Sequence, residues 1–127
     1  MQRTIAQIHP ILARLFLAGL LLQFYLAGAG LFGVGTFQPH RMLGDALTVL
    51  SFLFLILAVV GRLGRKLIGL SILLALLTIV QVMLPSLRGS VSWIAALHPV
   101  NALALMGVST MIRRSGRTKP VSELSGK

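Results

Sequence analysis

Four long runs of apolar residues dominate the chain, and each is bounded by short stretches that contain glycine, proline or charged residues. The runs span residues 10–32, 42–60, 67–84 and 91–112. Each is close to the roughly 20 apolar residues that a helix needs to cross a hydrocarbon core of about 30 Å. Because helices satisfy their own backbone hydrogen bonds where water is absent, the pattern predicts four transmembrane helices.

The connectors between the runs are short and rich in turn-forming residues. These are Gly33, Gly35 and Pro39 in the first connector, Gly61 and Gly64 in the second, and Pro85 and Gly89 in the third. Short links join antiparallel neighbours, so we expect an all-α, antiparallel four-helix transmembrane bundle in one domain over residues 1–114. Residues 115–127 are polar and are expected to form a disordered cytoplasmic tail.

Composition supports an integral membrane protein. Of the 127 residues, 56% are hydrophobic and 11% are charged, and the mean hydropathy is +0.92. The first apolar run is longer than the 7 to 15 residues that are typical of a signal-peptide core, so we expect it to remain as the first span. The absence of cysteine excludes disulfides, thiolate ligands and covalently attached heme, so any metal must be held by other groups.

The net charge of +10 is distributed unevenly along the chain. Two basic residues, Arg41 and Arg88, fall on one side of the predicted bundle, and the other ten fall on the opposite side: Arg3, Arg14, Arg62, Arg65, Lys66, Arg113, Arg114, Arg117, Lys119 and Lys127. The positive-inside rule then predicts a multi-pass protein of the cell inner (plasma) membrane with both termini in the cytoplasm. We expect the basic clusters to contact anionic lipid headgroups, and no motif indicates nucleic-acid binding.

Two histidines recur at the same spacing in the two halves of the chain. His40 follows Gln23 by 17 positions, and His98 follows Gln81 by 17 positions. An offset of 58 residues superposes both pairs and also matches Leu26 with Leu84, Ala46 with Ala104, Leu47 with Leu105 and Ser51 with Ser109. The leucine matches carry little weight in so apolar a chain. The pattern supports the hypothesis of a duplicated helical hairpin, with two imidazoles that face each other across a pseudo-two-fold axis.

Paired histidines on alternate helices favour a metal ligand role over simple packing. Neutral imidazole binds iron in a porphyrin, and helical bundles commonly build such sites between facing helices. We therefore predict heme b with His40 and His98 as its axial ligands. Gly44 lies one turn below His40, where a missing side chain leaves room for a flat macrocycle. His9 lies toward the cytoplasmic side and is expected to be an interfacial residue outside the site.

Other polar residues in or beside the spans have more than one interpretation. Arg41 and Arg88 could pair with heme propionates. Gln23 and Gln81 could contact a ligand, although hydrogen bonds between helices are the favoured role. Asp45 could be a structural carboxylate paired with Arg41, four residues away and near the positive end of the same helix, or it could handle protons or orient the site. The sequence leaves both readings of Asp45 open.

Three short segments around these residues carry a resemblance to a known family. Residues 40–44 read His-Arg-Met-Leu-Gly, residues 81–84 read Gln-Val-Met-Leu, and residues 96–103 read Ala-Leu-His-Pro-Val-Asn-Ala-Leu. They resemble the His-Arg-x-x-Gly, Gln-Val-x-Leu and Ala-Leu-His-x-x-Asn-Ala-Leu segments of the heme A synthase family. The resemblance covers about 100 residues and corresponds to one four-helix half of an eight-helix architecture. It implies heme ligation by His40 and His98 and adds Asn101 to the cofactor-binding residues.

The chain also departs from that family, because it has no second half, no extracytoplasmic cysteine pair and no glutamate near the site. Heme binding is therefore expected to carry over, whereas heme A synthesis is not. The prediction is a small membrane heme b protein for electron transfer or heme handling, since two axial nitrogens leave iron no open position. Its partners would be a membrane redox complex or a second copy of the chain.

Two alternatives use the same sequence features differently. In the first, the chain is a cofactor-free accessory or assembly subunit of a membrane complex, and its histidines form hydrogen bonds within the bundle. In the second, it is a small proton-coupled drug exporter, which the size and number of spans would fit. The exporter is weakened because the first helix carries Gln23 where a membrane-embedded carboxylate would be needed.

Overall fold

A computed structural model describes residues 2–116 of the chain, and all regular elements within that range are helical. Four helical segments are long and apolar enough to cross a membrane. The all-α, four-span part of the sequence prediction is thus confirmed. The predicted tail lies mostly outside the described residues, as do Arg117, Lys119 and Lys127.

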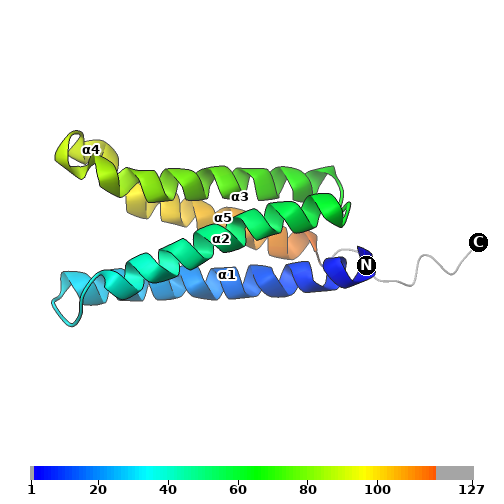
Figure 1. Cartoon of the computed structure of the whole chain (residues 1–127), viewed down its shortest axis with the longest axis horizontal. Helices are drawn as coiled ribbons and strands as arrows, with labels where there is room; N and C mark the ends of the chain where they lie inside the picture. Colours follow the sequence, from blue (N-terminus) through cyan, green and yellow to red (C-terminus); the bar gives the residue numbers. More distant parts are fainter. Residues whose placement is uncertain (1, 117–127) are drawn as a thin grey trace, which may run out of the picture.

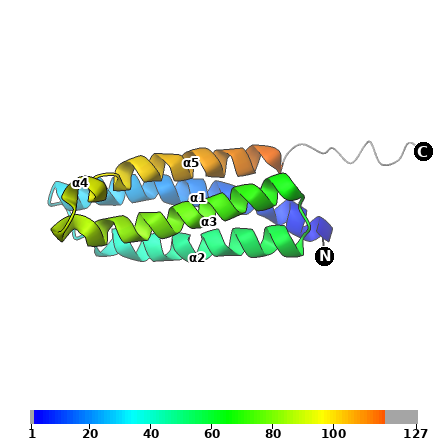
Figure 2. The ribbon, with the colours of Figure 1, turned by 90° about the horizontal axis from the view of Figure 1, so that it is seen from above.

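Three long helices are followed by a segmented fourth span. The long helices are α1 (Gln2–Leu31), α2 (Gln38–Val60) and α3 (Arg65–Met83), and the 3-10 helix η1 (Leu84–Gly89) extends the third span. The short α4 (Ser92–Ala95) and α5 (His98–Ser115) form the fourth span. Figure 1 shows the chain running back and forth along one long axis, with η1 and α4 at the end opposite the N-terminus. The main contacts join α1 to α2 and α5, and α3 to α2 and α5. As a result, α2 and α5 face each other across the bundle (Figure 2).

The observed helices differ from the predicted spans at their ends and at one interruption. α1 begins at Gln2, well before the predicted start at residue 10, and Pro10 lies inside it. The fourth span, predicted as continuous over residues 91–112, is interrupted by a turn at residues 96–97 and continues to Ser115. Proline is well tolerated in a first helical turn, where its missing N–H leaves no hydrogen bond unmade. Pro39 and Pro99 occupy such positions, and the helices that carry the two histidines begin beside them.

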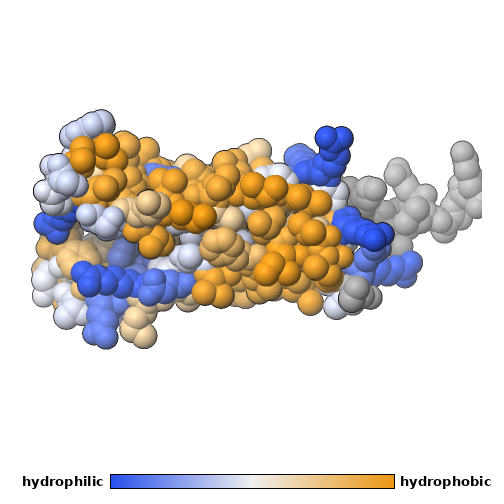
Figure 3. All heavy atoms as spheres, turned by 45° about the horizontal axis from the view of Figure 1, so that its top comes forward, coloured by the Kyte–Doolittle hydropathy of each residue, from blue (hydrophilic) through white to orange (hydrophobic). Residues whose placement is uncertain are grey.

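The core lies along the bundle axis and takes apolar side chains from every long helix. Phe16 of α1, Phe54 of α2, Leu74 of α3 and Ile112 of α5 are fully buried in it. Many large apolar side chains point outward instead. Figure 3 shows this surface as an apolar band between polar ends. A bundle with an apolar exterior of this kind is suited to a lipid environment.

The structure corrects the expected environment of His9. Its side chain is 1% exposed, and its ring packs edge-on against Phe54 with the ring centroids 5.0 Å apart. α1 begins earlier than predicted, so position 9 is part of the helix and its side chain is buried in the bundle. Its position at the membrane interface stays a prediction. Ile5, His9, Ala13, Phe16 and Leu20 then form one buried stripe at helical spacing.

Candidate functional site

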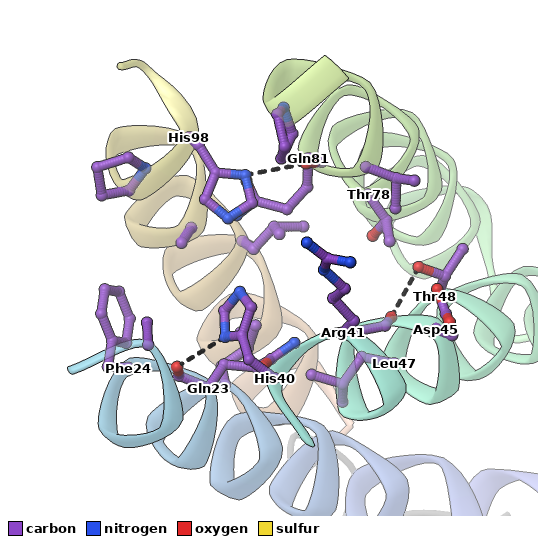
Figure 4. Close-up of a pocket in the computed structure, with 18 of the residues that line it drawn as sticks. Gln23, Phe24, His40, Arg41, Asp45, Leu47, Thr48, Thr78, Gln81 and His98 are labelled. Atoms are coloured by element: carbon purple, nitrogen blue, oxygen red, sulfur yellow. Dashed lines mark hydrogen bonds between the residues drawn. The ribbon is translucent and has the colours of Figure 1, made fainter. Parts of the chain in front are cut away.

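His40 and His98 lie face to face at the end of the bundle opposite the N-terminus, which we call the histidine end. His40 is in the first turn of α2, and His98 is the first residue of α5. Their ring centroids are 6.2 Å apart, and the ring planes are inclined by 61° (Figure 4). The structure therefore brings together the two residues that the repeat paired.

The two imidazoles are held by equivalent hydrogen bonds to the backbone. His40 Nδ1 lies 3.1 Å from the Gln23 carbonyl oxygen, and His98 Nδ1 lies 3.0 Å from the Gln81 carbonyl oxygen. Because a carbonyl oxygen only accepts, each Nδ1 must carry the proton and donate it. Each ring is thereby fixed as the tautomer that leaves a lone pair on Nε2. Metal-ligating histidines commonly donate their second nitrogen to a carbonyl in this way.

A cavity of about 390 Å³ surrounds the histidine pair. Its size falls within the roughly 300–1,000 Å³ of typical small-molecule sites. Figure 3 shows the molecule hollowed near the histidine end. The walls come from α1, α2, α3, η1 and α5, and the lining residues are Phe16, Leu20, Gln23, Phe24, Ala27, His40, Arg41, Gly44, Asp45, Leu47, Thr48, Thr78, Gln81, Val82, Pro85, His98, Pro99, Ala102 and Leu105.

The cavity lining repeats with the same offset of 58 positions that superposes the histidines. All but three of its residues form pairs at that offset: Leu20 with Thr78, Gln23 with Gln81, Phe24 with Val82, Ala27 with Pro85, His40 with His98, Arg41 with Pro99, Gly44 with Ala102 and Leu47 with Leu105. Phe16, Asp45 and Thr48 are the residues without a partner in the lining. Equivalent positions of the two halves thus enclose the same cavity from opposite sides.

Gln81 connects His98 to the neighbouring helix through its side-chain amide. Its Nε2 lies 3.2 Å from His98 Nε2, where the amide donates to the ring nitrogen. Its Oε1 accepts a 2.7 Å hydrogen bond from Asn101 Nδ2, which also contacts the Leu77 carbonyl oxygen at 2.9 Å. The predicted interhelical role of glutamine is confirmed here between α3 and α5. For His98 to bind a metal through Nε2, the Gln81 amide must first rotate away.

Gln23 occupies the equivalent position in the first half but has a different environment. Its Oε1 is buried without a hydrogen-bond partner among the described residues. Its Nε2 lies only 2.9 Å from the point where a Cβ atom on Gly44 would be. Gly44 therefore admits the Gln23 amide against α2. The space that we expected Gly44 to leave for a macrocycle is shared with this side chain.

The structure brings one of the two expected arginines to the cavity. Arg41 lines it, and Figure 4 shows its guanidinium directed inward. Arg88 is exposed on η1 and is not among the lining residues. Asp45 lines the cavity, but within the described part of the chain no ion pair joins it to Arg41, and Figure 4 shows the two groups pointing apart.

Sequence reasoning missed two hydroxyl-bearing residues of the cavity wall, Thr48 and Thr78. Thr48 Oγ1 donates to the Gly44 carbonyl oxygen at 2.9 Å, and Thr78 Oγ1 donates to the Leu74 carbonyl oxygen at 2.7 Å. Both could have been found by helical spacing, since Thr48 lies one turn after Gly44 and Thr78 lies three residues before Gln81.

The two imidazoles suit a metal whose other ligands come from a cofactor. Within residues 2–116, no group of three or more His, Cys, Asp or Glu side chains is placed to hold a metal ion. A porphyrin supplies four equatorial nitrogens and needs only axial ligands from the protein. The donor set at the histidine end therefore fits an axially ligated heme better than an isolated metal ion.

Comparison with known families finds a match that covers part of this site. Residues 23–89 match the model of DUF6220, a family of unknown function. The matched segment contains His40, Gly44 and Gln81 and ends before His98. No curated protein and no solved structure shows significant similarity to the chain. Because the match covers more than half of the sequence, the chain belongs to the DUF6220 family.

Proposed function

We propose that the protein is a small transmembrane heme b protein in which His40 and His98 are the axial ligands. The main support for this proposal is the distance between the ring centroids of His40 and His98. A metal–imidazole bond of about 2.0 Å, with roughly 1.1 Å more from the nitrogen to the ring centroid, separates two rings on opposite sides of one metal by about 6.2 Å. The observed centroid distance is 6.2 Å.

The surrounding residues have defined tasks in this proposal. The Gln23 and Gln81 carbonyl oxygens hold the Nδ1–H groups and orient the rings. His40 Nε2 is then available to a metal, and His98 Nε2 becomes available once the Gln81 amide rotates away. When bound, heme would supply one-electron redox chemistry, and two axial nitrogens favour electron transfer or heme handling over oxygen chemistry. The partner would be a membrane redox complex or a second copy of the chain.

The contact between Gln81 and His98 favours a second candidate, a cofactor-free accessory or assembly subunit. In that role, the Gln81 amide satisfies His98 Nε2 and Asn101 satisfies the amide oxygen, so α3 and α5 are joined without a ligand. Hydrogen bonds of this kind stabilise helix pairs in membranes by about 0.6–2 kcal/mol each. The two candidates therefore differ in whether Gln81 is displaced from His98.

Visible spectra of the detergent-purified protein distinguish the two candidates. Six-coordinate heme b should give sharp reduced bands after dithionite treatment, and either His40→Ala or His98→Ala should abolish or convert them. Added imidazole should partly restore the bands in both variants, because it can occupy the vacated ligand position. His9→Phe is the matched control, since it keeps the aromatic contact with Phe54. Bands that survive both alanine substitutions would exclude His40 and His98 as ligands.

We also propose that the helices cross the inner membrane as an antiparallel up-and-down bundle formed by a duplicated hairpin. The paired cavity lining supports the duplication. The charge distribution supports the orientation, with Arg41 and Arg88 at the extracytoplasmic histidine end and most basic residues beside anionic lipid in the cytoplasmic leaflet.

Reporter fusions test this topology. Fusions after Arg62 and after Arg114 should be active only with a cytoplasmic reporter, whereas a fusion near Gly35 should be active with a periplasmic one. A periplasm-active reporter at the C-terminus would contradict the proposed orientation.

A further inference from the structure

The two sides of the cavity are equivalent in position but not in chemistry. Four polar residues break the repeat, and each has an apolar counterpart at the offset of 58: Arg41 with Pro99, Asp45 with Leu103, Thr48 with Met106, and Thr78 with Leu20. All four polar residues belong to α2 or α3, and all four counterparts belong to α5 or α1. Leu103 and Met106 do not line the cavity, and the polar lining residues of α1 and α5 are Gln23 and His98. The four additional polar residues make the α2/α3 side of the cavity the more polar one, and we call it the polar α2/α3 side.

The close-up view shows this division directly. In Figure 4, Thr48, Thr78 and Asp45 lie on one side of the histidine pair, and Phe24 lies on the other. The Arg41 guanidinium extends into the space between α2 and α3. A ligand with one anionic edge and one apolar edge would meet matching surroundings in only one of its two orientations.

Arg41 is the cationic residue that lines the cavity within the described part of the chain, and it is an exposed residue. Its guanidinium is directed into the cavity, where it can form a charge-assisted hydrogen bond with an anionic group of a ligand. Asp45 points away from it, and no ion pair joins the two within the described residues. The hydroxyls of Thr48 and Thr78 already donate to carbonyls of their own helices, so they retain only acceptor capacity. A carboxylate on the ligand would satisfy Arg41.

We infer that the polar α2/α3 side sets the orientation of the ligand, with its carboxylate edge against Arg41 and its apolar edge against α1 and α5. This inference rests on the proposed function and makes Arg41, and not Arg88, the specificity-determining cation. Asp45 acts in the opposite direction, because its negative charge on the same side weakens the attraction of Arg41 for the carboxylate edge. The positions that match at the offset of 58 supply the two histidine ligands. The positions that differ at that offset select one of two otherwise similar orientations of the ligand.

Two porphyrins that differ only in charge test the inference. The purified full-length protein is titrated with iron protoporphyrin IX and with its dimethyl ester, which keeps the macrocycle and iron but lacks both carboxylates. The wild-type protein should prefer the acid by about 10- to 100-fold, the range expected for a charge-assisted hydrogen bond. Arg41→Gln should remove most of this preference, whereas Arg88→Gln should leave it unchanged. Asp45→Asn should increase it.

Moving the cation to the other side of the cavity is a sharper test. In the double variant Arg41→Gln with Pro99→Arg, the guanidinium occupies the position equivalent to Arg41, and the preference for the acid should return. Equal affinity of the wild-type protein for the two porphyrins, or an unchanged preference in Arg41→Gln, would overturn the inference. If neither porphyrin binds in a manner that depends on His40 and His98, the proposed function itself fails.

Discussion

The halves that carry His40 and His98 use the same backbone contact but different side-chain contacts. In both, Nδ1 of the histidine donates to the carbonyl oxygen of a glutamine 17 positions earlier. In the second half, the glutamine side chain also binds the histidine and is held by Asn101. In the first half, Leu43 stands at the position equivalent to Asn101, and the Gln23 amide oxygen has no partner among the described residues.

This difference indicates which half can adapt to a ligand. Helix packing alone sets the two backbone contacts, so they are the same in both halves. The Gln81 network is fully satisfied, and disrupting it would leave buried polar groups without partners. Gln23 has an unsatisfied oxygen to begin with, so moving its side chain costs less. The first half is therefore the more adaptable side of the site, and the second half is the more rigid.

The largest effect is expected from adding a side chain at Gly44. A Cβ there would lie 2.9 Å from Gln23 Nε2, so Gly44→Leu must displace Gln23 into the cavity. The amide is the flexible end of the Gln23 side chain, so the protein should still fold. The displaced amide and the added leucine would fill the space of the macrocycle, so heme content should fall although both histidines remain. Gly107→Leu is the control because no atom lies within 4 Å of its added Cβ. Heme content per folded protein is measured for both variants. Equal heme content in wild type and Gly44→Leu would place the macrocycle elsewhere.

A smaller effect should separate the two glutamines. Gln81→Ala removes the acceptor for Asn101 and the donor for His98 Nε2, which should destabilise the protein by about 1–3 kcal/mol. Gln23→Ala removes an amide whose oxygen is already unsatisfied, so its cost should be lower by at least about 1 kcal/mol. Unfolding in mixed micelles with increasing denaturing detergent measures both. A larger loss for Gln23→Ala than for Gln81→Ala would reverse the assignment of the adaptable half.

The smallest effect on stability is expected from substitutions at positions where the two halves have the same residue in the same environment. Ser51 and Ser109 are equivalent and buried, and each donates to a carbonyl of its own helix, at 2.7 Å and 2.6 Å. The corresponding alanine substitutions should each change stability by about 1 kcal/mol or less, because the hydroxyl competes with the backbone for an acceptor that is already bonded. The same unfolding assay should give matching values. A difference well above 1 kcal/mol between them would show that the two environments are not equivalent.

The sequence could predict the helices because their length and apolarity are demanded by the membrane. It could not predict their ends as well, since proline acts differently at different helix positions. Pro10 lies within α1, whereas Pro99 lies in the first turn of α5 after the break at residues 96–97. The burial of His9 was not predicted because the start of α1 was placed too late. The histidine pair could be predicted because each histidine follows a glutamine, Gln23 or Gln81, by 17 positions. This spacing does not depend on where the helices begin and end.

The sequence by itself determined the number of spans, the pairing of His40 with His98 and the charge difference between the two ends of the chain. Only the tertiary structure decided that Arg41 lines the cavity while Arg88 does not, and that Thr48 and Thr78 join it. The same holds for the placement of Gln81 against His98 and of Gln23 against Gly44. Hydrophobic periodicity fixes where a helix runs and which face it buries. The rotation and crossing of helices far apart in the sequence fix which side chains meet, because those depend on packing across the whole bundle.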